Sequence, residues 1–146
     1  MSDSENRLVT ITPGILTICT YTEFAPFSYE EGGEIVGTDI SFLKNFAAEM
    51  DLKVKILKKD FSGLWETPAQ GICDVSAAGM MEYEDRILGD GSVWSEPYML
   101  VTRSLLIRSS DREILKSPED FRGKKIVVTP TSSAHIDLSL IHISEP

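Results

Sequence analysis

The sequence is poor in the residues that metal sites and disulfide-rich folds require. Its 146 residues include two cysteines, Cys19 and Cys73, and two histidines, His135 and His142. Two cysteines are too few for a disulfide framework, and their spacing fits neither a zinc site nor a CxxC redox motif. Because both lie in apolar, strand-like runs, we expect them to be small buried thiols. No Ser/His/Asp or metal-ligand set can be assembled, so we predict no catalytic residue, no metal and no cofactor.

Positive charge is also scarce, and long apolar runs are absent. The chain carries 14 Lys and Arg against 23 Asp and Glu, for a formal net charge of −9. An acidic chain without a basic stripe repels phosphate backbones, which excludes nucleic acid as an expected partner. No apolar run approaches the ~20 residues of a membrane span, and residues 1–10 lack the basic start and apolar core of an export signal. With 42% hydrophobic and 25% charged residues, the composition is typical of a soluble globular protein.

What is present is an alternation of strand-like and helix-like segments. Residues 14–20 are β-branched and apolar, which indicates a strand buried on both faces, and a loop containing Pro26 follows. Residues 39–50 keep their apolar side chains on one helical face and begin with an acid, which suits a helix start. Residues 53–58 alternate between polar and apolar and predict a second strand. Residues 61–70 predict a short helix, limited by a proline near its end.

The alternation continues in the rest of the chain. Residues 73–78 predict a third buried strand, and residues 100–107 predict a strand long enough to leave one domain and enter another. Ser117 begins a helix, with Pro118 at its first position and acids in its first turn. Residues 125–129 predict one more strand, followed by a polar turn. This strand–helix–strand order implies right-handed crossovers and a mainly parallel sheet, so we predict the α/β class.

Five short motifs, in their order and spacing, resemble one protein family. They are Phe24-Ala-Pro-Phe-Ser-Tyr29, Gly37-Thr-Asp-Ile40, Gly71-Ile-Cys-Asp74, Trp94-Ser-Glu-Pro-Tyr98 and Ser117-Pro-Glu-Asp-Phe-Arg-Gly-Lys124. Over residues 13–137 the chain resembles the family 3 extracellular solute-binding proteins, the amino-acid-binding components of ABC importers. The resemblance implies a type II periplasmic-binding fold of two α/β lobes. It also implies a non-catalytic protein of the periplasm, or another extracytoplasmic compartment, that delivers its ligand to an ABC permease.

The resemblance also divides the chain. It implies an N-terminal extension over residues 1–12, a first lobe over 13–104, and a hinge with the start of a second lobe over 105–137. Residues 138–146 fit no family element and are similar to the translation of a sequencing-library adapter. We therefore expect a truncated gene with an incomplete second lobe. Such a chain is expected to bind an amino acid weakly or not at all, and to associate through uncovered apolar surface.

Arg86 is the residue that the chemistry favours most as a ligand contact. It lies seven residues after Gly79, in a charged loop at the carboxyl end of a predicted strand, where ligands of open α/β sheets collect. A guanidinium can hold a carboxylate through two parallel hydrogen bonds. The resemblance assigns this position to the α-carboxylate of an amino acid. The alternative is a solvated arginine paired with Glu84 or Asp85.

Two aromatic residues are the next candidates. Phe24 and Phe61 each follow a predicted strand, and the resemblance makes them aromatic walls that pack on the ligand. An ammonium group of the ligand would add a cation–π contact to such a wall. The alternative is simple packing under the loop. Phe27 and Tyr29 are expected to pack the loop down rather than to contact the ligand.

The resemblance places four further residues at the ligand carboxylate. Gly79 and Met81 belong to the segment that binds it, and Met81 stands where the family usually has Ser or Thr. Methionine keeps the backbone N–H but lacks the hydroxyl, so the site is expected to be weaker or the ligand larger. Ser132 and Ser133 would contribute hydroxyls and a helix N-terminus. A glycine is more usual in the family where Thr131 stands.

Two other functions remain open on the sequence. A cyclohexadienyl dehydratase-like enzyme resembles this family in the first lobe and would bind a prephenate-like acid through Arg86. The sequence offers no carboxylate to nominate as its general acid. The third possibility is the ligand-sensing domain of a membrane signalling receptor, which would show as a membrane span and a signalling domain downstream.

Overall fold

The computed structural model describes residues 8–140 and separates into two compact units, Met1–Trp94 and Ser95–Pro146. The division lies between residues 94 and 95, and the boundaries expected from the resemblance, at residues 12, 104 and 137, stay predictions. None of the described helices has the length and apolar character that crossing a membrane requires.

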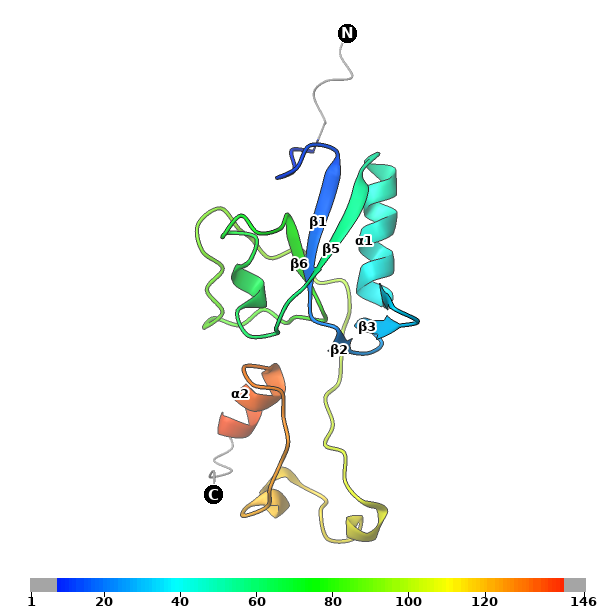
Figure 1. Cartoon of the computed structure of the whole chain (residues 1–146). Coiled ribbons are helices and arrows are strands. Elements are labelled where there is room, and N and C mark those ends of the chain that lie inside the picture. Colours follow the sequence, from blue (N-terminus) through cyan, green and yellow to red (C-terminus); the bar gives the residue numbers. More distant parts are fainter. Residues whose placement is uncertain (1–7, 141–146) are drawn as a thin grey trace. The chain divides into compact units, whose positions relative to one another are not determined.

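The first unit is built on a three-stranded parallel sheet (Figure 1). Its strands are β1 (Ile15–Thr20), β5 (Lys53–Lys58) and β6 (Val75–Ala77), in the order β5-β1-β6. β1 lies in the centre and pairs in parallel with both neighbours. The first two strands and the parallel α/β class are confirmed. The third strand forms where it was predicted, but it is shorter than residues 73–78.

Alternation along β1 buries side chains on both faces of this sheet. Leu16 and Ile18 pack with Ala47 of the helix α1 (Thr38–Glu49). Cys19 packs on the opposite side with Leu64 of the 3-10 turn η1 (Leu64–Glu66). α1 and η1 therefore lie on opposite faces of the sheet (Figure 1), and the prediction of a strand buried on both faces is confirmed.

The predicted helices of the first unit both form, although the second is short. α1 carries Asp39 in its first turn and ends one residue before the predicted end. The segment 61–70 forms only η1, and the Thr67 hydroxyl donates to the Leu64 carbonyl at 2.7 Å. Pro68 comes next and lacks the N–H that a longer helix would need.

A small antiparallel sheet replaces the loop expected between β1 and α1. It consists of β2 (Glu23–Phe24), β3 (Ser28–Glu31) and β4 (Glu34–Val36), in that order. The hydroxyls of Thr20 in β1 and Ser28 in β3 are buried and lie 2.7 Å apart. This hydrogen bond fixes the small sheet to the end of β1.

Cys19 and Cys73 form a disulfide, so the expectation of two free thiols is wrong. Cys19 lies in β1 and Cys73 just before β6, and the parallel pairing of these strands brings their Cα atoms to 5.9 Å. That separation suits a disulfide. Both side chains are buried, as expected, with 0% and 1% exposed. Their sequence separation of 54 residues gave no sign of the contact, which only the strand pairing creates.

The described part of the second unit holds three short helical segments. They are η2 (Ser109–Asp111), η3 (Pro118–Phe121) and α2 (Ser133–Leu140). The helix start predicted at Ser117 is confirmed. The Asp120 carboxylate accepts the backbone N–H groups of Lys116 at 2.9 Å and Ser117 at 2.8 Å. These hydrogen bonds lower the pKa of Asp120 below its ordinary value, and the bond from Lys116 contributes most.

The prediction of two strands in this unit is wrong. Residues 100–107 and 125–129 form no strand, and no strand occurs among the described residues of the second unit. Leu106 and Val127 are 100% and 98% exposed. An apolar run becomes a strand only where a neighbouring strand pairs its backbone N–H and C=O groups, and these two segments lack that neighbour in the described structure.

The segment expected to be a non-family tail begins inside α2. Residues 138–140 belong to this helix, as does His135. Residues 141–146, which include His142, lie outside the described residues. The interpretation of this tail therefore stays a prediction.

The disulfide predicts how the first unit responds to a reductant. Reduction should lower the free energy of unfolding by about 2–4 kcal/mol, because the bond closes a loop across 54 residues and so restricts the unfolded chain. Urea unfolding followed by tryptophan fluorescence, with and without reductant, measures the difference. The double variant Cys19→Ala, Cys73→Ala serves as the control and should not respond to reductant. An equal lack of response in the unaltered protein would show that the two thiols are unpaired.

Candidate functional site

The candidate site residues of the first unit gather at one edge of the parallel sheet. Phe24 follows β1, Phe61 follows β5 and Gly79 follows β6, each within a few residues of its strand end. Because the three strands are parallel, their carboxyl ends meet at the same edge. This is the edge at which open α/β sheets bind ligands.

Gly79 allows an aromatic ring to lie directly on the backbone of this edge. A Cβ at this position would come within 2.7 Å of Cε1 of Phe24 and 3.1 Å of the Phe27 ring. Gly79 also has φ +56°, which favours glycine. The rings of Phe24 and Phe27 lie against each other, 5.0 Å between centroids. Phe24 is 39% exposed, so part of its ring remains accessible at the edge.

The first turn of α1 fixes the start of the loop after β6. The Asp39 carboxylate accepts the Gly79 N–H at 2.7 Å, and Asp39 is only 3% exposed. Asp39 donates its own N–H to the Phe27 carbonyl at 3.1 Å. Asp39 thus ties the helix to the aromatic pair through its backbone N–H and to the Gly79 loop through its buried carboxylate. The sequence indicated Asp39 only as a helix start.

Arg86 is buried, which excludes the alternative of a solvated arginine. It is 5% exposed, and its Nη1 donates to the Met81 carbonyl at 2.6 Å. The guanidinium carbon lies 4.7 Å from the ring centroid of Trp65, 5.2 Å from Tyr83 and 5.4 Å from Phe61. Burial lowers the pKa of Arg86, while Tyr83 and Asp85 oppose this shift. The guanidinium stays charged, because arginine does not lose its proton in proteins.

The structure brings the five predicted residues of the first unit into two contacting groups. Gly79 lies under Phe24, Met81 accepts from Arg86, and Arg86 stacks on Phe61. Phe61 is only 8% exposed and also packs edge-on against Tyr21, at 5.7 Å between centroids. Phe61 therefore packs in the core and supports Arg86, and it is also a candidate wall of the ligand site.

Sequence reasoning missed Trp65 and Tyr83, which hold the same guanidinium. Trp65 lies four residues after Phe61, and its ring packs edge-on against that ring at 6.1 Å. Tyr83 precedes Arg86 by three residues, and the Arg86 N–H donates to the Tyr83 carbonyl at 3.0 Å. The aromatic spacing at Phe61 and Trp65 was the available signal, but only the fold shows that the Arg86 guanidinium lies over both rings.

Ser132 and Ser133 lie in the second unit, at the start of α2. The Ser132 hydroxyl accepts the His135 N–H at 3.2 Å and so caps the helix. Thr131 has φ +60°, the left-handed region that glycine favours, and its N–H donates to Nδ1 of His135 at 3.1 Å. The expected turn followed by a helix is present. The ligand contact of Ser132 and Ser133 stays a prediction.

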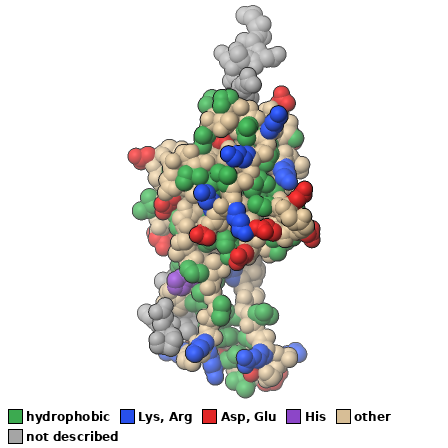
Figure 2. Space-filling model, in the orientation of Figure 1, with side chains coloured by type: hydrophobic (Ala, Val, Ile, Leu, Met, Phe, Trp, Pro, Cys, Tyr) green, Lys and Arg blue, Asp and Glu red, His purple; other side chains and the backbone are tan. Residues whose placement is uncertain are grey.

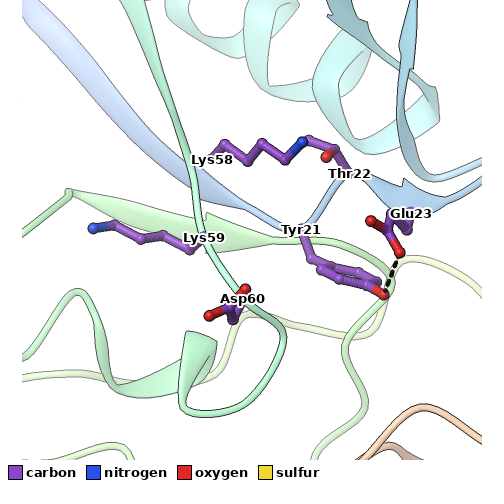
Figure 3. A pocket seen from close by; sticks show the side chains of 6 residues that line it. All are labelled: Tyr21, Thr22, Glu23, Lys58, Lys59 and Asp60. Atoms are coloured by element: carbon purple, nitrogen blue, oxygen red, sulfur yellow. Dashed lines mark hydrogen bonds between the residues drawn. The ribbon is translucent and has the colours of Figure 1, made fainter.

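A cavity of about 240 Å³ opens beside the carboxyl ends of β1 and β5 (Figure 3). Its lining residues are Tyr21, Thr22, Glu23, Lys58, Lys59 and Asp60. The Tyr21 hydroxyl donates to the Glu23 carboxylate at 3.3 Å. Figure 3 shows the Lys59 ammonium pointing away from Tyr21. The ammonium of Lys58 pairs with Glu30, which raises the pKa of Lys58 and lowers that of Glu30.

The arrangement suits recognition of a small charged molecule. A buried arginine, aromatic rings and a neighbouring cavity lined by two carboxylates and two lysines lie at one sheet edge. Among residues 8–140, no group of three or more His, Cys, Asp or Glu side chains is placed to hold a metal ion. On the face shown in Figure 2, basic and acidic side chains of the first unit are interspersed with hydrophobic ones.

Known proteins are similar to this chain in sequence and in fold. Arginine-binding protein ArgT of Corynebacterium glutamicum is 26% identical over 133 residues, which cover 85% of this chain and 40% of ArgT. The structure of an ancestral arginine-binding protein bound to arginine has 30% sequence identity and a TM-score of 0.79, covering 88% of this chain and 56% of that one. An ancestral amino acid-binding protein, described as a precursor of cyclohexadienyl dehydratase, has 28% identity and a TM-score of 0.67 over 75% of this chain and 48% of its own.

These relatives are named as binding proteins, and this chain spans about half of their length or less. The family model for bacterial extracellular solute-binding proteins, family 3, matches residues 16–139. That range covers most of each unit and confirms the resemblance drawn from the motifs. This chain belongs to the family 3 bacterial extracellular solute-binding proteins.

Proposed function

We propose that this chain forms part of a receptor that binds an amino acid for ABC-type import, without catalysing a reaction. The buried Arg86 at the carboxyl edge of the sheet is the observation that carries the proposal. Burying a charged side chain is unfavourable unless charge or hydrogen-bonding partners offset it. The three rings and the Met81 carbonyl offset part of this cost, and a ligand carboxylate would add two parallel hydrogen bonds to the guanidinium.

Other residues complete the proposed carboxylate site. The rings of Phe61, Trp65 and Tyr83 use the faces of the guanidinium, whereas a carboxylate binds its edge, so both interactions are compatible. The backbone of Gly79 and Met81 borders the same loop, and Phe24 offers an accessible aromatic surface. Ser132 and Ser133 are proposed as contacts from the second unit.

We further propose that the bound amino acid has a cationic side chain. Two relatives are named for arginine binding. The cavity at the same edge is lined by the carboxylates of Glu23 and Asp60 and by two lysines. Glu30 balances the charge of Lys58, and the Lys59 ammonium points away from Tyr21 (Figure 3). A cavity of about 240 Å³ is small and fits one extended side chain better than a drug-sized ligand.

The family supports an extracytoplasmic site of action, with an ABC permease as the partner that receives the ligand. A periplasmic location is therefore part of the proposal. A dehydratase-like activity has no comparable support, because the neighbour linked to that enzyme is itself described as an amino acid-binding protein. Assaying the protein for conversion of prephenate or arogenate would test that alternative.

The role of Arg86 is tested with Arg86→Met, which keeps an apolar side chain of similar length among the three rings. L-arginine affinity should fall at least about 25-fold, because loss of one partner from a desolvated charge pair costs about 2–5 kcal/mol. Two-dimensional NMR titrations measure this affinity even when it is weak. Agmatine, which is arginine without its carboxylate, should bind the variant and the unaltered protein equally. The exposed Arg112→Met is the matched control. Retained arginine affinity in Arg86→Met would refute the carboxylate assignment.

The preference for a cationic side chain is tested with the double variant Glu23→Gln, Asp60→Asn. L-arginine affinity should fall about 2- to 30-fold, because exposed ion pairs contribute about 0.2–1 kcal/mol each. L-glutamine, whose side chain is neutral, should bind as before. The pair Glu34→Gln, Glu49→Gln removes the same charge from exposed positions of the same unit and should have no such effect. Equal losses for both amino acids would contradict the proposed charge preference.

A further inference from the structure

The guanidinium of Arg86 lies in an aromatic cage that the proposed carboxylate contact does not by itself require. We define the cage as Phe61, Trp65 and Tyr83, whose ring centroids lie 4.7–5.4 Å from the guanidinium carbon. A carboxylate needs only the charge and the two N–H groups of one arginine. Three rings around that arginine, and its 5% exposure, call for a separate explanation.

The cage fixes where the guanidinium can lie. An arginine side chain in water samples many rotamers, and ordering it on ligand binding opposes affinity. Here the rings hold the guanidinium by their faces, while the Met81 carbonyl accepts from Nη1 at 2.6 Å. These contacts set both the position and the rotation of the group before any ligand arrives. Because the rings occupy its faces, a ligand carboxylate would approach in the plane of the guanidinium.

The rings are themselves held by the core. Phe61 belongs to the buried cluster around the Cys19–Cys73 disulfide, and Trp65 packs against the same cluster. Leu64, between them in the chain, is fully buried. Tyr83 comes from the other side, in the loop after β6, and its carbonyl accepts the Arg86 N–H. The cage therefore joins the segment after β5 to the loop after β6.

The rings also change the surroundings of the charge. They exclude water from the guanidinium faces, and burial is the main cause of the lowered pKa of Arg86. In a less polar environment the attraction between a guanidinium and a carboxylate is stronger than in water. A ring face offsets part of the lost hydration through its negative quadrupole. The charge is thus kept partly dehydrated without becoming unstable.

We propose that Trp65 and Tyr83 are positioning residues for ligand binding: with Phe61 they hold Arg86 in a fixed and partly dehydrated position that favours the α-carboxylate of an amino acid. This proposal rests on the proposed function. It adds two residues to the site and gives them a role that acts through Arg86. A purely structural cage would stabilise the loop but would not change the selectivity for a carboxylate.

The test compares Trp65→Leu and Tyr83→Leu with Trp65→Phe and Tyr83→Phe. Leucine keeps an apolar side chain but removes the aromatic ring, whereas phenylalanine keeps an aromatic ring face for the guanidinium. The probes are L-arginine and agmatine, and NMR titration gives the ratio of their affinities. Each leucine variant should lower this ratio roughly tenfold, as expected for loss of one desolvated cation–π contact. Each phenylalanine variant should stay within about twofold of the unaltered protein. Trp65 packs against the buried cluster, whereas Tyr83 is partly buried in the loop after β6, so the Tyr83 variant tests the proposal even if Trp65→Leu unfolds.

Two controls separate the possible failures. Phe46→Leu removes an aromatic ring from α1, away from the cage, and should leave the ratio unchanged. In the Arg86→Met background, Trp65→Leu should have no further effect on the ratio, because the two residues act as one unit. Leucine variants that lose stability but keep the ratio would overturn the cage proposal. A ratio that is unchanged in Arg86→Met itself would overturn the proposed function instead.

Discussion

The burial of β1 on both faces is the constraint on which the first unit depends. Leu16 and Ile18 need a layer on one side and Cys19 needs one on the other, which α1 and η1 provide. Both neighbours of β1 then run parallel to it, because chain segments cross over between them. Parallel pairing brings the three strand ends to one edge, and every candidate site residue of this unit follows one of those ends.

At that edge, the dominant feature is a charge removed from water. Arg86 is surrounded by Phe61, Trp65 and Tyr83, and its position depends on the core that holds these rings. The disulfide lies in the same core cluster, and the Asp39 carboxylate fixes the start of the loop that carries Arg86. Stability and recognition are therefore coupled in this unit, since the groups that fold it also orient the proposed ligand contact.

The sequence pattern correctly predicted those helices and strands that are specified by residues close together in the chain. The β-branched apolar run of β1, the apolar face of α1 and the Ser117 helix start all depend on residues within one element. The strands predicted at residues 100–107 and 125–129 do not form, because an apolar run becomes a strand only when a neighbouring strand pairs with it. The disulfide was missed for the same reason, because Cys19 and Cys73 meet only through the pairing of β1 with β6.

The sequence by itself determined the α/β class, the family and Arg86 as the candidate for an anionic group, because these follow from periodicity and from motifs in order. Only the tertiary structure decided that Arg86 is buried, that Trp65 and Tyr83 enclose it, and that Asp39 holds the Gly79 loop. Those contacts join residues from different elements. Their distances are set by how the sheet, α1 and the loops pack, which no local pattern encodes.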